Sequence, residues 1–218
     1  MPELDLLRSL PRARRNIEAR QTAKTPELVA LSRQYGRDYF DGSRDVGYGG
    51  YRYDGRWVPV ARDIVAHYGL KPGDRVLDVG CGKGFLVKDL LAQGIDAYGL
   101  DVSDYALKVC EPEVVGRLHL GSAERLPFPD HSFDVVLAIN TLHNLPRPEL
   151  RQALGEMTRL ARKGSFLQVD SYRTPEEKAL FESWVLTAYT YGYPDEWRAI
   201  FDEAGYLGDY YWTFITGE

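Results

Sequence analysis

The sequence predicts an α/β fold built around a doubly wound, mainly parallel sheet, and three observations lead to this prediction. Short apolar stretches alternate with helical periodicity from residue 75 onward. A glycine-rich turn over residues 80–84 joins the first stretch to the first helix. Polar side chains end or follow three of the stretches, at Asp101, Asn140 and Asp170. Because ligands bind beyond the carboxyl ends of the strands in such sheets, these side chains predict one cleft.

The chain is expected to divide into an N-terminal arm and lid over residues 1–57 and one domain over residues 58–218. From Tyr35 to Trp57, tyrosines are interleaved with glycines. This composition is typical of a loop-rich cover and of neither a regular helix nor an alternating strand.

The predicted elements follow one another in regular alternation after the lid. Strands are predicted over residues 75–79, 96–101, 117–120, 133–139, 164–171 and 208–215. Helices are predicted over residues 26–40, 58–68, 84–92, 103–109, 147–161, 175–190 and 194–204. This order predicts a sheet covered by helices on both faces and connected by right-handed crossovers.

The first strand and its glycine turn indicate the kind of ligand. Glycines at a strand-to-helix turn let the backbone approach a ligand closely, and the helix start offers unpaired N–H groups. Asp101 ends the second predicted strand, where a carboxylate can accept hydrogen bonds from both hydroxyls of a ribose. A cofactor that contains a nucleoside is therefore expected.

A dinucleotide-binding turn needs the spacing G-x-G-x-x-G, whose third glycine allows tight packing beside a pyrophosphate. Here Phe85 occupies the position of that third glycine, which argues against an NAD(P)-dependent oxidoreductase. Asp78 lies two residues before Gly80 and suits a ligand that carries an ammonium group. At these residues the chain resembles the class I S-adenosylmethionine-dependent methyltransferases of the small-molecule type, from about Val60 to the C-terminus.

Four segments carry the resemblance in the expected order: residues 76–84, 99–101, 121–128 and 133–140. The resemblance implies a Rossmann-like sheet of seven strands in the order 3-2-1-4-5-7-6, with the last strand antiparallel. It also implies that S-adenosylmethionine is the cofactor.

The resemblance further implies which residues contact that cofactor. Gly80, Cys81 and Gly82 would lie against its methionyl and ribose parts. The other expected contacts are Asp78 near the ammonium, Asp101 at the ribose hydroxyls, Val102 on the adenine face, Ala123 and Glu124 at the adenine edge, and the Asn140 carbonyl toward the ammonium.

Two residues beyond the strand ends are candidates for catalysis. His143 follows the fourth predicted strand, and an imidazole with a pKa of about 6.5 can accept a proton from a hydroxyl. The alternative for His143 is packing at the start of a helix. Asp170 ends the fifth strand and could orient a hydroxyl or an amine, or equally cap the next helix.

The aromatic residues indicate where an acceptor could bind. Tyr189, Tyr191 and Tyr193 could line a pocket together with Tyr48 and Tyr51, or they could be half-buried packing residues. A hydroxyl of a sugar, a glycan precursor or a secondary metabolite is the expected methyl acceptor. The alternative function is a non-catalytic partner or sensor that binds S-adenosylmethionine.

Composition limits the partners and the location. The net charge of −5 over 218 residues gives no general attraction to nucleic acid or to an anionic membrane. Two cysteines and no long apolar run predict a cytoplasmic protein without disulfides, and no residue spacing predicts a metal site. The first 24 residues hold six basic and three acidic side chains, which are expected to form a solvated arm rather than an RNA or membrane contact. The oligomeric state stays open.

Overall fold

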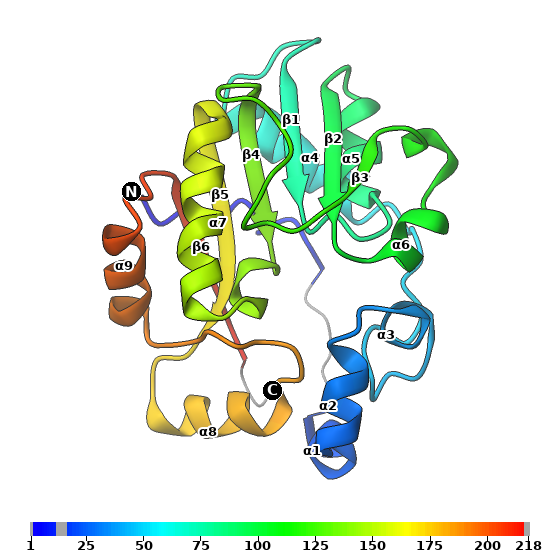
Figure 1. The fold of residues 1–218 in the computed structure, drawn as a ribbon, viewed down its shortest axis with the longest axis vertical. Coiled ribbons are helices and arrows are strands. Elements are labelled where there is room, and N and C mark those ends of the chain that lie inside the picture. The colour runs from blue at the N-terminus through cyan, green and yellow to red at the C-terminus, as the bar shows by residue number, and fades with distance from the viewer. Residues whose placement is uncertain (1, 12–16, 216–218) are drawn as a thin grey trace.

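The computed structural model describes residues 2–11 and 17–215 of the chain. A central sheet is covered by helices on both faces, and further helices lie beyond the carboxyl ends of its strands (Figure 1). The strands are β1 (Arg75–Val79), β2 (Asp96–Asp101), β3 (Leu118–Leu120), β4 (Phe133–Ile139), β5 (Ala161–Ser171) and β6 (Asp209–Phe214). The α-helices are α1 (Ile17–Ala23), α2 (Pro26–Ser32), α3 (Arg37–Asp41), α4 (Trp57–His67), α5 (Phe85–Leu91), α6 (Asp104–Lys108), α7 (Arg147–Leu160), α8 (Pro175–Trp184) and α9 (Pro194–Glu203). Two 3-10 turns are η1 (Pro112–Val114) and η2 (Leu142–Asn144).

The sheet confirms the predicted Rossmann-like α/β fold. Its six strands lie in the order β3-β2-β1-β4-β5-β6, and every neighbouring pair is parallel. The prediction of a seventh strand and of an antiparallel last strand is wrong for the described residues. β6 pairs directly with β5, from Phe166 opposite Asp209 to Ser171 opposite Phe214, so no strand can be inserted between them.

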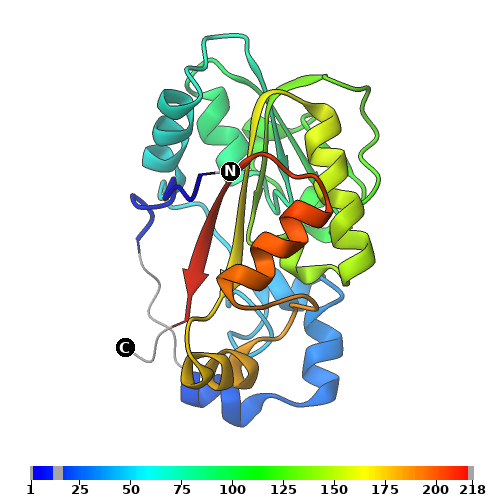
Figure 2. The ribbon, with the colours of Figure 1, turned by 90° about the vertical axis from the view of Figure 1, so that its left-hand side faces the viewer.

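The first residues of the chain cover the outer edge of β6. The Leu4 N–H donates to the Tyr210 carbonyl at 2.8 Å, and the Tyr210 N–H donates to the Pro2 carbonyl at 3.2 Å. Figure 2 shows this N-terminal trace beside β6. Leu6 and Leu7 are then buried against the sheet, so this part of the expected solvated arm is packed. Covering an edge strand removes the unpaired backbone groups that would otherwise recruit another chain.

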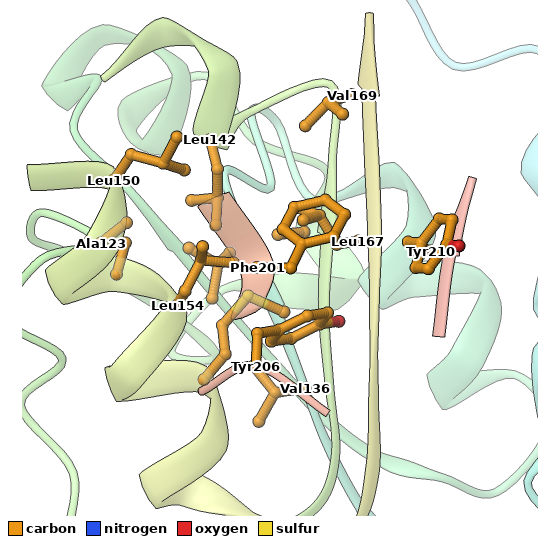
Figure 3. Packing of buried hydrophobic residues seen from close by; sticks show 14 of the residues in the cluster. Ala123, Val136, Leu142, Leu150, Leu154, Leu167, Val169, Phe201, Tyr206 and Tyr210 are labelled. Atoms are coloured by element: carbon orange, nitrogen blue, oxygen red, sulfur yellow. The ribbon is translucent and has the colours of Figure 1, made fainter. Parts of the chain in front are cut away.

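Two apolar layers hold the sheet between its helices. Figure 3 shows side chains of α7 and α9, such as Leu154 and Phe201, meeting Val136 of β4 and Leu167 of β5. On the other face α4 and α5 pack on β1 and β4. β4 is buried along its whole length, in keeping with a sequence that is apolar except for Asp134. None of the helices in the described ranges is long and apolar enough to cross a membrane.

Side-chain caps mark where several helices begin. Thr25 and Thr174 precede a proline and accept the N–H of the residue three positions on, at 3.2 Å in both cases. Ser103 caps α6 in the same way, at 3.0 Å from the Ala106 N–H. Each cap satisfies a backbone donor that the helix itself leaves free.

Two predicted helices are shorter in the structure. The helix expected over 26–40 is divided into α2 and α3 by Tyr35, which has a positive φ of 49°. The helix expected over 175–190 ends at Trp184. The N–H groups of Tyr189 and Thr190 donate to the His143 carbonyl at 3.0 Å, so the backbone there makes tertiary bonds in place of helical ones.

A buried ion pair fixes the lid on the glycine turn. Lys83 of that turn reaches both carboxylate oxygens of Asp41 in α3, at 2.8 and 2.7 Å, and also the Tyr51 carbonyl. Tyr105 of α6 donates to the same carboxylate at 2.7 Å. Burial alone would raise the pKa of Asp41, but the hydrogen bonds from Lys83 and Tyr105 hold it below its usual value. The pair therefore stabilises the folded protein above the pKa of an unfolded aspartate, and that stability is lost as the pH falls through the lower folded pKa.

Replacing Lys83 by methionine should leave Asp41 largely buried without its cation. We expect a loss of about 1–3 kcal/mol in the free energy of unfolding, measured by urea denaturation at pH 7.5. Lys108→Met is the matched control, because Lys108 pairs with Asp104 at the surface and its side chain is 71% exposed. Equal stability of the two variants would show that the Lys83 pair does not hold the lid.

Candidate functional site

A cavity opens at the carboxyl ends of β1, β2 and β4. Its volume is about 820 Å³ with its open mouth included. The strand ends and their loops contribute Gly80, Gly82, Asp101, Val102, Ser122, Ala123, Asn140, Thr141 and Asn144, among others, and the lid contributes Tyr35, Tyr39, Phe40, Tyr48 and Tyr51. The helices of the lid lie below the strand ends in Figure 1. This mixture of aromatic and polar walls suits a small organic ligand.

The glycine turn after β1 forms the floor of the cavity. Gly80 and Gly82 have positive φ angles of 81° and 55°, which side chains rarely adopt. A side chain at Gly80 would collide with Thr141, and a Cβ at Gly82 would lie 3.3 Å from Tyr51 and 3.4 Å from Phe40. The turn thus needs glycine both for its backbone and for the space above it.

Asp101 at the end of β2 has the geometry of a diol acceptor. Its Oδ2 accepts the Gly82 N–H at 2.7 Å, and its Oδ1 accepts the Ser103 N–H at 2.8 Å. Burial raises the pKa of Asp101, and these backbone hydrogen bonds partly offset the rise. Each oxygen of a carboxylate has two lone-pair positions, so both oxygens can accept a further donor from the cavity.

Asp78 is a second buried carboxylate, in a recess behind the cavity that Gly80, Cys81 and Asn140 also line. It makes no hydrogen bond or ion pair with any described residue. Burial, with the negative charge of Asp101 as a smaller contribution, raises the pKa of Asp78 to about 7. An isolated carboxylate in a buried recess is unfavourable, so this position is suited to a ligand cation.

The other predicted cofactor residues divide into two groups. Val102, Ala123 and Asn140 line the cavity. Asn140 has a φ of 55°, a strained value for a residue other than glycine, and such strain is often found at ligand sites. Glu124 is not among the residues that line the cavity. It accepts a hydrogen bond from Ser122, which does line the cavity. The role of Glu124 at an adenine edge stays a prediction.

His143 and Asp170 lie together behind the cavity wall. They are 4% and 7% exposed, and neither is among the lining residues. The Asp170 N–H points to His143 Nδ1 at 3.4 Å, while His143 Nε2 lies 3.8 Å from Asp170 Oδ2. Burial lowers the pKa of His143 against the opposing charge of Asp170, so the imidazole is neutral, and the hydrogen bond to Nδ1 assigns its proton to Nε2. The N-cap of α8 is Thr174, which removes helix capping as the role of Asp170.

The role of His143 as a base stays a prediction with a direct test. A base would make both His143→Ala and His143→Gln lose at least ~100-fold in kcat. A residue that only packs behind the wall would lower the unfolding midpoint in His143→Ala, while His143→Gln, which keeps a side-chain N–H, would stay within a few-fold of the parent in kcat. Steady-state rates and thermal melts of both variants separate these outcomes.

The aromatic residues are only partly where the sequence suggested. Tyr48 and Tyr51 line the cavity, with ring centroids 4.4 Å apart. Tyr191 and Tyr193 instead pack in a separate cluster around α8, and Tyr189 is 51% exposed.

Thr141, Ser122 and Tyr35 are wall residues that the sequence did not single out. Thr141 directly follows the predicted Asn140, but its contact with Gly80 joins two distant loops and has no signature in residue spacing. Within the described ranges, no group of three or more histidine, cysteine, aspartate or glutamate side chains could hold a metal ion.

Residues 77–169 match the family model of the methyltransferase domain. Together with the fold, this match supports the resemblance of the chain to the class I S-adenosylmethionine-dependent methyltransferases. The matched segment of this methyltransferase domain runs from β1 to β5 and includes the glycine turn, Asp101 and Asn140. S-adenosylmethionine is the cofactor that this resemblance implies.

Two curated relatives of the methyltransferase domain have named acceptors. A demethylmenaquinone methyltransferase of Renibacterium salmoninarum is 37% identical over 123 residues, which cover 55% of this chain and 49% of that protein. The sterol 24-C-methyltransferase erg6 of Schizosaccharomyces pombe is 36% identical over 110 residues, or 46% of this chain and 28% of that protein. The chain thus spans about half, or less, of the length of these relatives.

Solved structures share the fold of the methyltransferase domain. A SAM-dependent methyltransferase from Archaeoglobus fulgidus has a TM-score of 0.53 and 21% identity, with 78% of this chain and 72% of that chain covered. The YcgJ protein from Bacillus subtilis has a TM-score of 0.55 and 21% identity, with 66% of each chain covered.

Proposed function

We propose that this protein is an enzyme that transfers the methyl group of S-adenosylmethionine to a hydroxyl of a small organic acceptor. The observation that carries the proposal is the pair of buried carboxylates, Asp78 and Asp101, on either side of the glycine turn. The cofactor, when bound, supplies an electrophilic methyl group on a sulfonium.

The two carboxylates have different tasks in this proposal. Asp101 accepts the ribose hydroxyls through the lone pairs that Gly82 and Ser103 leave free. Asp78 pairs with the methionyl ammonium, which compensates the charge that the recess disfavours. Val102 and Ala123 contact the adenine, since they line the cavity next to Asp101.

The lid, within residues 1–57, excludes water and orients the acceptor above the domain of residues 58–218. Its rings pack on one another, with Phe40 and Tyr48 stacked at 5.8 Å, and Tyr51 stacks on Phe85 of α5 at 4.5 Å. Holding two reactants in line in this way can contribute roughly 7–11 kcal/mol to barrier lowering.

The acceptor class is a finer proposal. We expect a hydroxyl of a secondary metabolite or of a sugar or glycan precursor. The relatives named for demethylmenaquinone and sterol methylation support a small-molecule acceptor but not a sugar in particular. The aromatic walls favour a flat molecule over a sugar chain, because rings stack best on planar faces.

A methyl-release assay tests the proposed function. The protein is incubated with S-adenosylmethionine and pooled small metabolites, and S-adenosylhomocysteine is quantified by mass spectrometry. We expect its formation to depend on both the protein and the pool. Cofactor binding without any S-adenosylhomocysteine formed would support a non-catalytic sensor in place of the enzyme.

A further inference from the structure

Arg33 is a cation of the lid, two residues before the wall residue Tyr35, and it is not itself among the residues that line the cavity. It follows the last residue of α2, and its guanidinium stacks on the Tyr189 ring with 3.8 Å between its Cζ and the ring centroid. One terminal nitrogen donates to the Ala188 carbonyl at 3.3 Å. Its Nε is buried and has no hydrogen-bond partner, and no carboxylate of the described residues forms an ion pair with it. A buried donor without an acceptor is costly unless a ligand supplies one.

Tyr35 adds a second unpartnered donor beside Arg33. Ser103 Oγ donates to the Tyr35 carbonyl at 2.5 Å, which fixes this residue in its left-handed conformation. Its ring lines the cavity, while its hydroxyl is buried and makes no hydrogen bond. Burial raises the pKa of this hydroxyl; the charge of Arg33 partly offsets the rise and the charge of Asp101 adds to it, so the hydroxyl stays protonated and can donate.

Cations lie outside the cavity wall on the side of Arg33, and carboxylates lie at the glycine turn. Burial, with the positive charge of Arg33 as a smaller contribution, lowers the pKa of Lys24, which places a second cation near Arg33. Glu182 is the acid on that side, and it faces Lys24, whose Nζ donates to the Glu182 carbonyl at 2.6 Å. The carboxylate of Asp101 lines the cavity, and Asp78 lines the recess behind it.

We propose that the methyl acceptor is a planar molecule that carries a carboxylate, and that Arg33 Nε–H and Tyr35 O–H bind this carboxylate. This proposal rests on the proposed function, because it assigns the cofactor to the other end of the cavity. The positive charge of Arg33 orients the acceptor: its anionic group lies under α2, its hydroxyl points toward the glycine turn, and its ring packs among Tyr39 and Tyr48. A cationic acceptor would be repelled by Arg33 at this position.

A matched pair of probes tests the proposal by binding alone. 4-Hydroxybenzoate and 4-hydroxybenzamide have the same shape and differ in charge. Each is titrated into the protein saturated with S-adenosylhomocysteine, and affinity is measured by calorimetry or NMR. We expect the benzoate to bind at least ~10-fold more tightly than the benzamide, as charge-assisted hydrogen bonds require.

Three variants locate the effect. Arg33→Gln should weaken benzoate binding roughly 10–100-fold and leave benzamide binding within about threefold. Tyr35→Phe, which removes only the hydroxyl, should weaken benzoate binding by roughly 3–10-fold. Arg37→Gln is the control, since Arg37 is an exposed arginine of α3 and its loss changes the net charge equally.

The outcomes separate this proposal from the proposed function. Equal affinity for the two probes, no benzoate binding at millimolar concentration, or equal effects of Arg33→Gln and Arg37→Gln would overturn the acid-binding role. The parent protein and Arg33→Gln should bind S-adenosylhomocysteine equally. Failure of the parent protein to bind S-adenosylhomocysteine would instead contradict the proposed function itself.

Discussion

Replacing Asp101 by alanine is expected to weaken S-adenosylhomocysteine binding at least ~100-fold, because two charge-assisted hydrogen bonds to the ribose are lost. The same change removes the acceptor for the Gly82 and Ser103 N–H groups, so the glycine turn loses its support on β2. Calorimetric titration of the variant measures the affinity, and a thermal melt reports how much of the effect comes from stability.

Asp104→Ala is the matched control for this experiment. Asp104 begins α6 three residues after Asp101, but its side chain is 60% exposed and it pairs with Lys108 at the surface. We expect the control to bind S-adenosylhomocysteine like the parent. If Asp101→Ala and Asp104→Ala bind it equally well, the carboxylate of Asp101 does not hold the ribose.

Replacing Asp78 by asparagine is expected to raise the stability of the free protein and to weaken the binding of S-adenosylhomocysteine. The pKa of Asp78 is raised to about 7 in the folded protein, whereas that of an unfolded aspartate is about 3.9. Between these values the folded state keeps a proton that the unfolded state has lost. The contribution of Asp78 to stability therefore falls as the pH rises through this window, and the full penalty is present above pH 7.

Asparagine is neutral at every pH and removes that penalty. We expect Asp78→Asn to raise the free energy of unfolding at pH 8 by at most about 4 kcal/mol and to change it little at pH 4. Urea denaturation at the two pH values gives both numbers. A variant that is less stable than the parent at pH 8 would show that Asp78 is paired in the free protein.

The same substitution should weaken the binding of the cofactor. Loss of the charge opposite the methionyl ammonium is expected to lower the affinity for S-adenosylhomocysteine roughly 10–100-fold at pH 8. In the parent protein this affinity should fall about tenfold from pH 8 to pH 6 as Asp78 takes up a proton. In Asp78→Asn it should stay flat, and a parallel decline in both proteins would assign the titration to another group.

Features set by neighbouring residues could be predicted from the sequence. The glycine turn, Asp78 and Asp101 lie within one strand-turn-helix-strand unit, and both the fold and the position of the cavity follow from that unit. Mostly apolar strands such as β4 are buried on both faces, and they can be recognised from their own sequence alone.

Contacts between distant segments could not be predicted in this way. Lys83 forms an ion pair with Asp41 of the lid, and Arg33 stacks on Tyr189 more than 150 residues away. In the sequence, Lys83, Asp41 and Arg33 each look like an ordinary surface charge. The pairing of the first residues with β6 likewise depends on the position of β6 at the edge of the sheet, where only one of its sides pairs with β5. None of these contacts has a signature in residue spacing, so the packing of the lid and of the first residues could not be predicted.

Calorimetric titration of the unmodified protein with S-adenosylhomocysteine tests the central claim most directly. A nucleoside held over the glycine turn by Asp101 and Asp78 predicts one-to-one, saturable heat with this ligand and none with NADH. The absence of heat with S-adenosylhomocysteine, or saturable heat with NADH alone, would contradict it.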